Sequence, residues 1–177
     1  RLLLAARRPD AAQAMMLDGI RHHRGDPAFL VPLFGLLLQR QEDDRLVALA
    51  REYQVRPAGP EVRRLAAFAG AMASFYRGNY DQADDFLRSV PNLPDSRDGR
   101  LLLAKIHGER GERKRELLEV RNLAAEFPAD AEVHSVFVSR LRQSGLTDEA
   151  RRASLRFQLA HPELPAPRIE LLHAYRE

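Results

Sequence analysis

The chain has 177 residues, 45% of them hydrophobic, and a formal net charge of +3 at pH 7. This length suits one domain or a short array of repeats with a core of its own. Because the sequence contains no cysteine, it excludes disulfide frameworks, thiolate metal sites and cysteine nucleophiles. Apolar runs such as residues 29–38 are shorter than the roughly 20 residues that cross a bilayer, so we expect no membrane-spanning segment.

The first part of the chain predicts helices whose turn and end markers are irregularly spaced. Residues 1–10 suggest the end of a helix, and we therefore expect the sequence to be cut from a longer protein. Residues 5–27 predict a helix that ends at a proline, and residues 33–57 predict a helix pair with Gln41 at the turn. The acidic residues directly after this turn lie where the dipole of a starting helix favours negative charge.

From residue 64 onward the chain repeats itself with a fixed period. The glycines Gly78, Gly111 and Gly145 lie 33 and 34 residues apart, and Pro94, Pro128 and Pro162 follow one another at intervals of 34 residues. Each glycine stands between two apolar segments, where a turn between helices is expected. Each proline closes the second segment, because proline cannot continue a helix.

The segments between these markers have the pattern of amphipathic helices. Apolar residues recur at every third or fourth position over 117–127 and 133–141, which predicts one buried face in each segment. Thr147 is a favourable N-cap for the next helix, with acidic residues in its first turn. No segment alternates apolar and polar residues as a half-buried strand does, so we expect an almost wholly helical chain.

With this period and these turn residues, the chain resembles the tetratricopeptide repeat (TPR) family of helix–turn–helix repeats. The best match is 67–90, where Gly78 occupies the turn and Ala83 the close-packing position of the second helix; Glu116 replaces that alanine in the next unit and Ala150 restores it. The resemblance implies an all-α, right-handed superhelical solenoid of antiparallel helix pairs, with about four to five repeats.

The resemblance also divides the chain into approximate units within a single repeat domain, 1–177. The predicted units are 1–27 (partial), 28–61, 64–97, 98–130, 131–164, and 165–177 as a capping segment or partial next repeat.

The residues give no pattern for catalysis or cofactor binding. His22 and His23 are adjacent and would point about 100° apart on a helix, and no histidine pair has zincin spacing. There is no calcium loop and no glycine-rich phosphate loop. Acidic clusters are explained by helix starts. We therefore predict a non-enzymatic chain with no catalytic residue, no metal and no cofactor.

The basic stretch 109–121 is the strongest indication of nucleic-acid binding, because Arg110, Arg113, Lys114 and Arg115 could neutralise phosphates. Acidic residues interleave with these cations at helical spacing, and aromatic residues that would stack on bases are lacking. We interpret the stretch as a solvated helix face and do not expect a nucleic-acid partner.

In the TPR family the first helices line a concave surface that receives a peptide or a partner helix, and the repeat phase places specific residues there. Phe68 and Phe75 are candidate anchors and Arg142 a candidate charge partner; the equally weighted alternative is that Phe68, Met72 and Phe75 fill the core between repeats. The full predicted groove set is Leu65, Phe68, Met72, Phe75, Leu101, Lys105, Ser135, Ser139 and Arg142.

These features together predict a protein–protein interaction scaffold or adaptor that binds another protein or peptide. By analogy with the family, it would belong to a bacterial envelope or secretion assembly, and its composition fits the bacterial cytoplasm and the periplasm alike. The first alternative is an accessory regulatory or substrate-recruiting domain of a larger enzyme. The second is a helical-repeat nucleic-acid binder.

Overall fold

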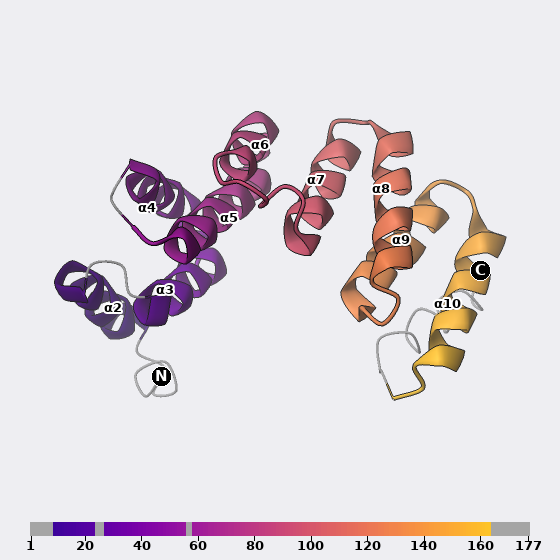
Figure 1. The fold of residues 1–177 in the computed structure, drawn as a ribbon, viewed down its shortest axis with the longest axis horizontal. Coiled ribbons are helices and arrows are strands. Elements are labelled where there is room, and N and C mark those ends of the chain that lie inside the picture. The colour runs from indigo at the N-terminus through magenta and orange to yellow at the C-terminus, as the bar shows by residue number, and fades with distance from the viewer. Residues whose placement is uncertain (1–8, 24–26, 56–57, 164–177) are drawn as a thin grey trace. The chain divides into compact units, whose positions relative to one another are not determined.

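The computed structural model describes residues 9–23, 27–55 and 58–163, and the expectations for residues 1–8 and 165–177 lie outside them. The described residues are mostly helical and contain no strand, which confirms the all-α fold class. Figure 1 shows the helices in chain order. They are α2 (Pro9–His23), α3 (Pro27–Gln39), α4 (Asp43–Val55), α5 (Pro60–Tyr76), α6 (Tyr80–Arg88), α7 (Arg97–Glu109), α8 (Arg113–Glu126), α9 (Ala131–Gln143) and α10 (Thr147–Ala160).

The chain divides into two compact bodies. The N-terminal body comprises residues 1–99 and the C-terminal body residues 100–177. The boundary falls in the first turn of α7, so the N-terminal body holds α2 to α6 and the C-terminal body holds most of α7 together with α8, α9 and α10. No described helix is long and apolar enough to cross a membrane.

Four turns between helices each contain one residue in the left-handed conformation. These are Gln41 (φ 56°), Gly78 (φ 73°), Gly111 (φ 79°) and Gly145 (φ 76°). In the third of these turns, the amide of Gly111 donates to the carbonyl of Gly108 over 3.0 Å, and the amide of Glu112 donates to the carbonyl of His107 over 2.8 Å. Equivalent pairs of bonds close the other three turns. This is the Schellman arrangement, which needs a left-handed residue just after the helix, so the predicted turn positions are correct.

The core of the N-terminal body forms where α5 packs between α4 and α6 (Figure 1). Gly70 marks the closest approach, because a Cβ added there would lie 2.7 Å from Ala50 on α4 and 2.8 Å from the Phe86 ring on α6. Ala83, at the predicted close-packing position, is fully buried. Small residues at these positions therefore let the three helices come together.

The core of the C-terminal body includes two apolar clusters. Buried residues of the first are Val138, Leu141, Ala150 and Ala153, with Leu117 and Phe137 packed against them. Buried residues of the second are Leu101, Leu123 and Val133, with Ala124, Phe127 and Val136 packed against them. Each cluster draws on helices that follow one another in the chain, as expected for stacked repeats.

The predicted N-cap of α10 is wrong by one residue. Leu146 occupies the N-cap position and Thr147 is already helical, with no side-chain capping bond. The turn explains the difference, because Leu146 directly follows the left-handed Gly145 and its amide closes the Schellman pair on Leu141. The acidic residues predicted in the first turn, Asp148 and Glu149, are present there.

Candidate binding surfaces

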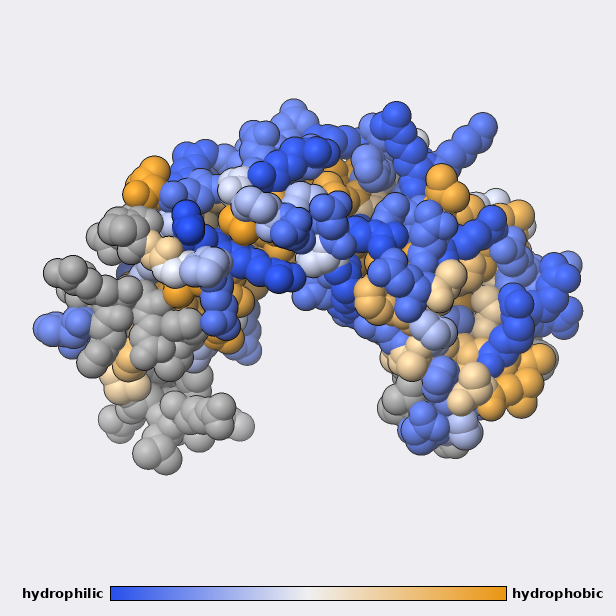
Figure 2. All heavy atoms as spheres, viewed as in Figure 1, coloured by the Kyte–Doolittle hydropathy of each residue, from blue (hydrophilic) through white to orange (hydrophobic). Residues whose placement is uncertain are grey.

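Hydrophilic side chains predominate on the face drawn in Figure 2, and hydrophobic residues emerge between them in separate patches. A surface of this kind is typical of a folded protein in water. Sites for apolar partners must therefore be sought in particular helices.

Four of the predicted groove residues form a line on α5, which we call the α5 strip: Leu65, Phe68, Met72 and Phe75. They recur at three- and four-residue spacing, so they share one face of the helix, and each is half-buried. The buried residues of α5 lie elsewhere around the helix and include Ala66, Gly70 and Ala73. The strip thus combines apolar side chains with residual exposure.

Aromatic rings gather at the C-terminal end of this strip. The centroid of Phe75 lies 5.8 Å from that of Tyr76 in an edge-on arrangement and 5.8 Å from that of Tyr80 in a tilted one. Tyr76 is 63% exposed. Aromatic pairs at such separations stabilise each other beyond the burial of area, so Phe75 is held in place while its neighbour remains open to solvent.

The remaining groove residues lie in the C-terminal body, and the structure separates Leu101 from the others. Leu101 is 3% exposed and packs with Leu123 and Val133, so its side chain is part of the core and offers no contact to a partner. Lys105 on α7 is half-buried. Half-buried residues also form a polar line on α9, which consists of Ser135, Ser139 and Arg142.

Glu116, the exception at the close-packing position, is a buried charge. Its side chain is 2% exposed and forms an ion pair with Arg140 of α9 through Oε1 and Nε. Arg113 lies 3.5 Å from the other carboxylate oxygen. Gly108 makes room for the carboxylate, because a Cβ at that position would lie 2.3 Å from Oε1. An ion pair and a glycine thus stand in for the alanine of the other repeats.

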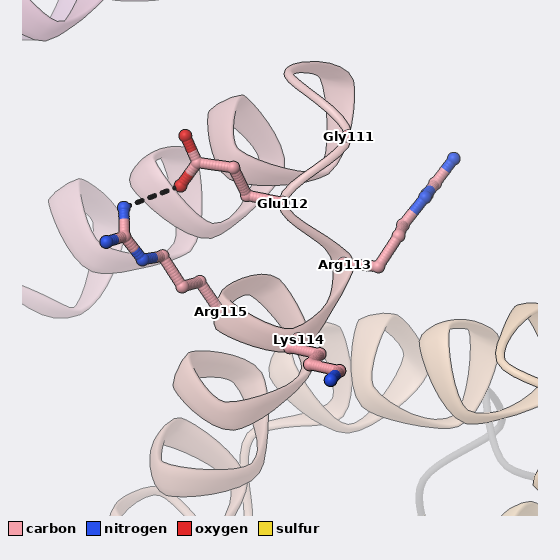
Figure 3. A pocket seen from close by; sticks show the side chains of 5 residues that line it. All are labelled: Gly111, Glu112, Arg113, Lys114 and Arg115. Carbon is pink, nitrogen blue, oxygen red and sulfur yellow. Dashed lines mark hydrogen bonds and ion pairs between the residues drawn. The ribbon is translucent and has the colours of Figure 1, made fainter.

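The predicted basic stretch does not form a convergent cationic site. Arg115 is paired with Glu112 at 2.8 Å, and this arginine lowers the pKa of Glu112 below its ordinary value. Figure 3 shows the side chains of Arg113, Lys114 and Arg115 pointing away from one another around an open hollow. One phosphate cannot be gripped by cations that diverge, so the geometry gives no support to the nucleic-acid alternative.

A cleft in the C-terminal body was not predicted from the sequence. It has a volume of about 460 Å³ and lies between α8, α9 and α10; we call it the α8–α10 cleft. Its apolar wall includes Phe137 and Phe157, and the His134 ring stacks on Phe157 with centroids 4.0 Å apart and planes 19° apart. The His161 ring lies 4.9 Å from Phe157 at the end of the same wall.

Burial, and then the charges around this cleft, favour neutral His134. Burial lowers the pKa of His134 from 6.5 to about 4, and the nearby His161 and Arg156 add to the shift. Arg121 on α8 is paired with Glu149 on α10 at 2.6 Å. Near neutral pH the imidazole therefore contributes a flat, uncharged surface with one N–H donor.

Among the described residues, no group of three or more histidine or acidic side chains is placed to hold a metal ion. His107 instead pairs with Glu112 at 3.0 Å across the turn between α7 and α8. His22 lies 3.4 Å from Asp18 on α2, and both side chains are exposed. These histidines are accounted for by local polar contacts.

The fold belongs to the class of all-helical proteins built from stacked helix pairs. Comparison with solved structures identifies which kind of helical repeat it resembles. The structure resembles TTC0263, a thermophilic TPR protein of Thermus thermophilus, with a TM-score of 0.68 and 19% identity over 99% of this chain and 95% of that one. It also resembles YrrB, described as a TPR protein with an unusual peptide-binding site, with a TM-score of 0.56 and 16% identity over 91% of this chain and 82% of that one. No family model and no curated relative matches. The chain thus has the fold of a TPR helical-repeat protein.

Proposed function

We propose that this chain is a protein-binding scaffold, and that the α5 strip receives apolar side chains of a partner protein or peptide. The observation that carries the proposal is the state of Phe68, Met72 and Phe75, which are half-buried on one face of α5. Side chains in this state are already ordered by the core, so a partner that covers them loses little conformational freedom on the scaffold's side. Methionine and aromatic residues also adapt well to varied apolar partners.

The C-terminal body offers polar residues of its own to a partner. Lys105 lies on α7, and Ser135, Ser139 and Arg142 share one face of α9. Hydroxyl and cationic groups of this kind select partners by hydrogen bonding and charge more than they add raw affinity. We propose that acidic or amide groups of a partner contact these residues, with Arg142 as the charge partner. Leu101 is excluded from this surface because its side chain belongs to the core.

The fold supports this function by analogy. Stacked helix pairs present extended surfaces that bind other proteins, and YrrB, a TPR protein, carries a peptide-binding site. We retain the division into repeat units 28–61, 64–97, 98–130 and 131–164 as part of the proposal. Action without catalysis, and a place in a bacterial envelope or secretion assembly, remain predictions from the family resemblance.

Two matched variants test the α5 strip. Met72→Glu places a charge in the strip, and Val55→Glu places the same charge at the end of α4, where Val55 is 85% exposed. Wild type and both variants would be used as bait in a lysate of the source cells, with helicity checked by circular dichroism and retained proteins identified by mass spectrometry. We expect Met72→Glu alone to lose a protein that the other two retain.

Two other results would contradict the assignment. If both variants retain the same protein, the partner binds elsewhere on the chain. If Met72→Glu loses its helical signal, the strip belongs to the core between repeats, which is the alternative that the sequence left open.

A further inference from the structure

We propose that the α8–α10 cleft binds an acidic segment of a partner protein, with an apolar side chain inside the cleft and a neighbouring carboxylate at Arg156. This inference rests on the proposed function, because it assigns a second contact to a protein partner. It concerns a surface formed largely by second helices of the repeats, and not the first-helix residues of the α5 strip. The space and the charges of the cleft carry the inference.

The space in the cleft comes from small residues that line its sides. These are Ala124 and Ala125 on α8 and Ala153 and Ala160 on α10. Phe137 and the stacked pair of His134 and Phe157 form flat apolar surfaces between them. The volume of about 460 Å³ is within the range of ligand pockets and exceeds that of a single side chain. One apolar side chain of a partner can therefore enter.

The charges of the cleft favour an acidic occupant. Arg121 is balanced by Glu149, its partner at 2.6 Å. Arg156 makes a hydrogen bond of 3.4 Å to the backbone carbonyl of Arg152, and within the described residues it forms no ion pair. An arginine beside an apolar cleft presents a planar set of donors that matches a carboxylate. The cleft thus offers Arg156 to an acidic partner.

The wall of the cleft also contains an unsatisfied polar atom, on His134. Its Nε2 atom is buried and has no hydrogen-bond partner among the described residues. Buried polar atoms are normally paired, because leaving one without a partner is unfavourable. Arg156 and His134 both line the cleft. A carboxylate that meets Arg156 at the cleft therefore lies against the wall to which the neutral imidazole also belongs.

Phage-displayed random peptides selected on the folded chain provide the probe. We expect the selected peptides to share an aromatic or aliphatic residue next to aspartate or glutamate. The best peptide would then be synthesised together with a copy in which each acidic residue is replaced by its amide. Binding would be measured by isothermal titration, and the site by NMR shifts at His134 and Phe157.

Two arginines on α10 give a matched pair of variants. Arg156 lines the cleft, whereas Arg152, one turn earlier, makes the same kind of bond to the carbonyl of Asp148 over 3.3 Å and is not part of the lining. We expect Arg156→Gln to lower the affinity for the peptide about tenfold, since a tenfold change corresponds to one good charged contact. Arg152→Gln should lower this affinity less than about twofold. Ala125→Phe, which fills the cleft at an exposed position and keeps all charges, should weaken binding to a similar extent as Arg156→Gln.

Several results would overturn the assignment. Equal loss in both arginine variants, or full affinity in Ala125→Phe, would mean general attraction to a basic surface without use of the cleft. Equal binding of the amide peptide would remove the role of the carboxylate, and a selection without acidic residues would do the same. The proposed function is tested separately. If capture of the partner depends on Met72 but not on Arg156, the scaffold function stands and the cleft is rejected as a binding site. If capture depends on Arg156 but not on Met72, the α5 strip is rejected as the binding surface.

Discussion

The carboxylate of Glu116 on α8 meets the guanidinium of Arg140 on α9 inside the C-terminal body. Glu116 is 2% exposed, and Arg140 supplies the opposite charge that a buried carboxylate requires. Gly108 on α7 completes the arrangement, since any side chain there would meet the carboxylate. The three residues come from three successive helices, so the ion pair joins one helix pair to the next.

The space beside Glu116 predicts a coupled response to substitution at Gly108. In the wild-type chain, Gly108→Ala should lower the free energy of unfolding by about 1–3 kcal/mol, because the added methyl group overpacks the carboxylate. In a Glu116→Ala background the same change should be neutral or stabilise by up to about 1 kcal/mol, because alanine is the better helix former. Urea unfolding of the four chains measures both effects. Equal losses in the two backgrounds would contradict the contact.

The left-handed turns predict that replacing Gln41 by glycine stabilises the chain. Gln41 adopts φ 56°, where Gly78, Gly111 and Gly145 stand in the other turns. Gln41→Gly should raise the free energy of unfolding by about 0.5–1 kcal/mol, because glycine adopts this conformation without steric strain and the greater freedom of the unfolded chain offsets only part of the gain. The urea midpoint would report the change.

The reverse substitution, Gly111→Ala, is the control for this prediction. A Cβ at Gly111 would have no atom within 4 Å, so any loss reflects backbone strain alone and should be about 1 kcal/mol. If Gln41→Gly destabilises the chain, then the Gln41 side chain contributes more than its strain removes.

The sequence could predict the turns and the helix pairs because their signals are local. A left-handed turn needs glycine or a tolerant residue at one position, and the period of Gly78, Gly111 and Gly145 therefore follows directly from the backbone geometry. Burial depth is not local in this sense. The repeat phase placed Leu101 beside Lys105 in the groove, but residues of α8 and α9 close over Leu101.

The α8–α10 cleft could not be predicted for the same reason. Its walls come from three helices, and the alanines that create its space resemble ordinary helix formers in sequence. His134 has no spacing relationship to another titratable residue that would have indicated a site. Only packing shows that His134 stacks on Phe157 and that Arg156 lines the same cleft.

The two interpretations of the α5 strip predict different costs for losing an aromatic ring. Phe86 is 3% exposed and fills the core between α5 and α6, so Phe86→Ala should lower the free energy of unfolding by about 3–5 kcal/mol. Phe68 is half-buried, and Phe68→Ala should cost only about 1–2 kcal/mol, since less area returns to water. Guanidinium unfolding of both variants decides between them. A similar loss in the two variants would assign Phe68 to the core and remove it from the binding surface.

The buried imidazole of His134 predicts how stability depends on pH. Its pKa in the folded chain is about 4, below the ordinary value of 6.5, so the unfolded chain takes up the proton first as the pH falls. The stability associated with neutral His134 is therefore fully present above about pH 6.5 and is lost as the pH falls toward 4. With allowance for partial exposure, this loss amounts to about 1–2 kcal/mol.

His134→Phe isolates this contribution, because phenylalanine can retain the stack on Phe157 and cannot be protonated. We expect the free energy of unfolding of the wild type to fall by about 1–2 kcal/mol more than that of the variant between about pH 7 and pH 4.5. In the wild type, the NMR signal of the His134 ring carbon should stay constant down to about pH 5, since the folded pKa is about 4. A ring that titrates near pH 6.5, or parallel pH profiles for the two chains, would show that His134 is solvated and that the wall of the α8–α10 cleft is open to water at this point.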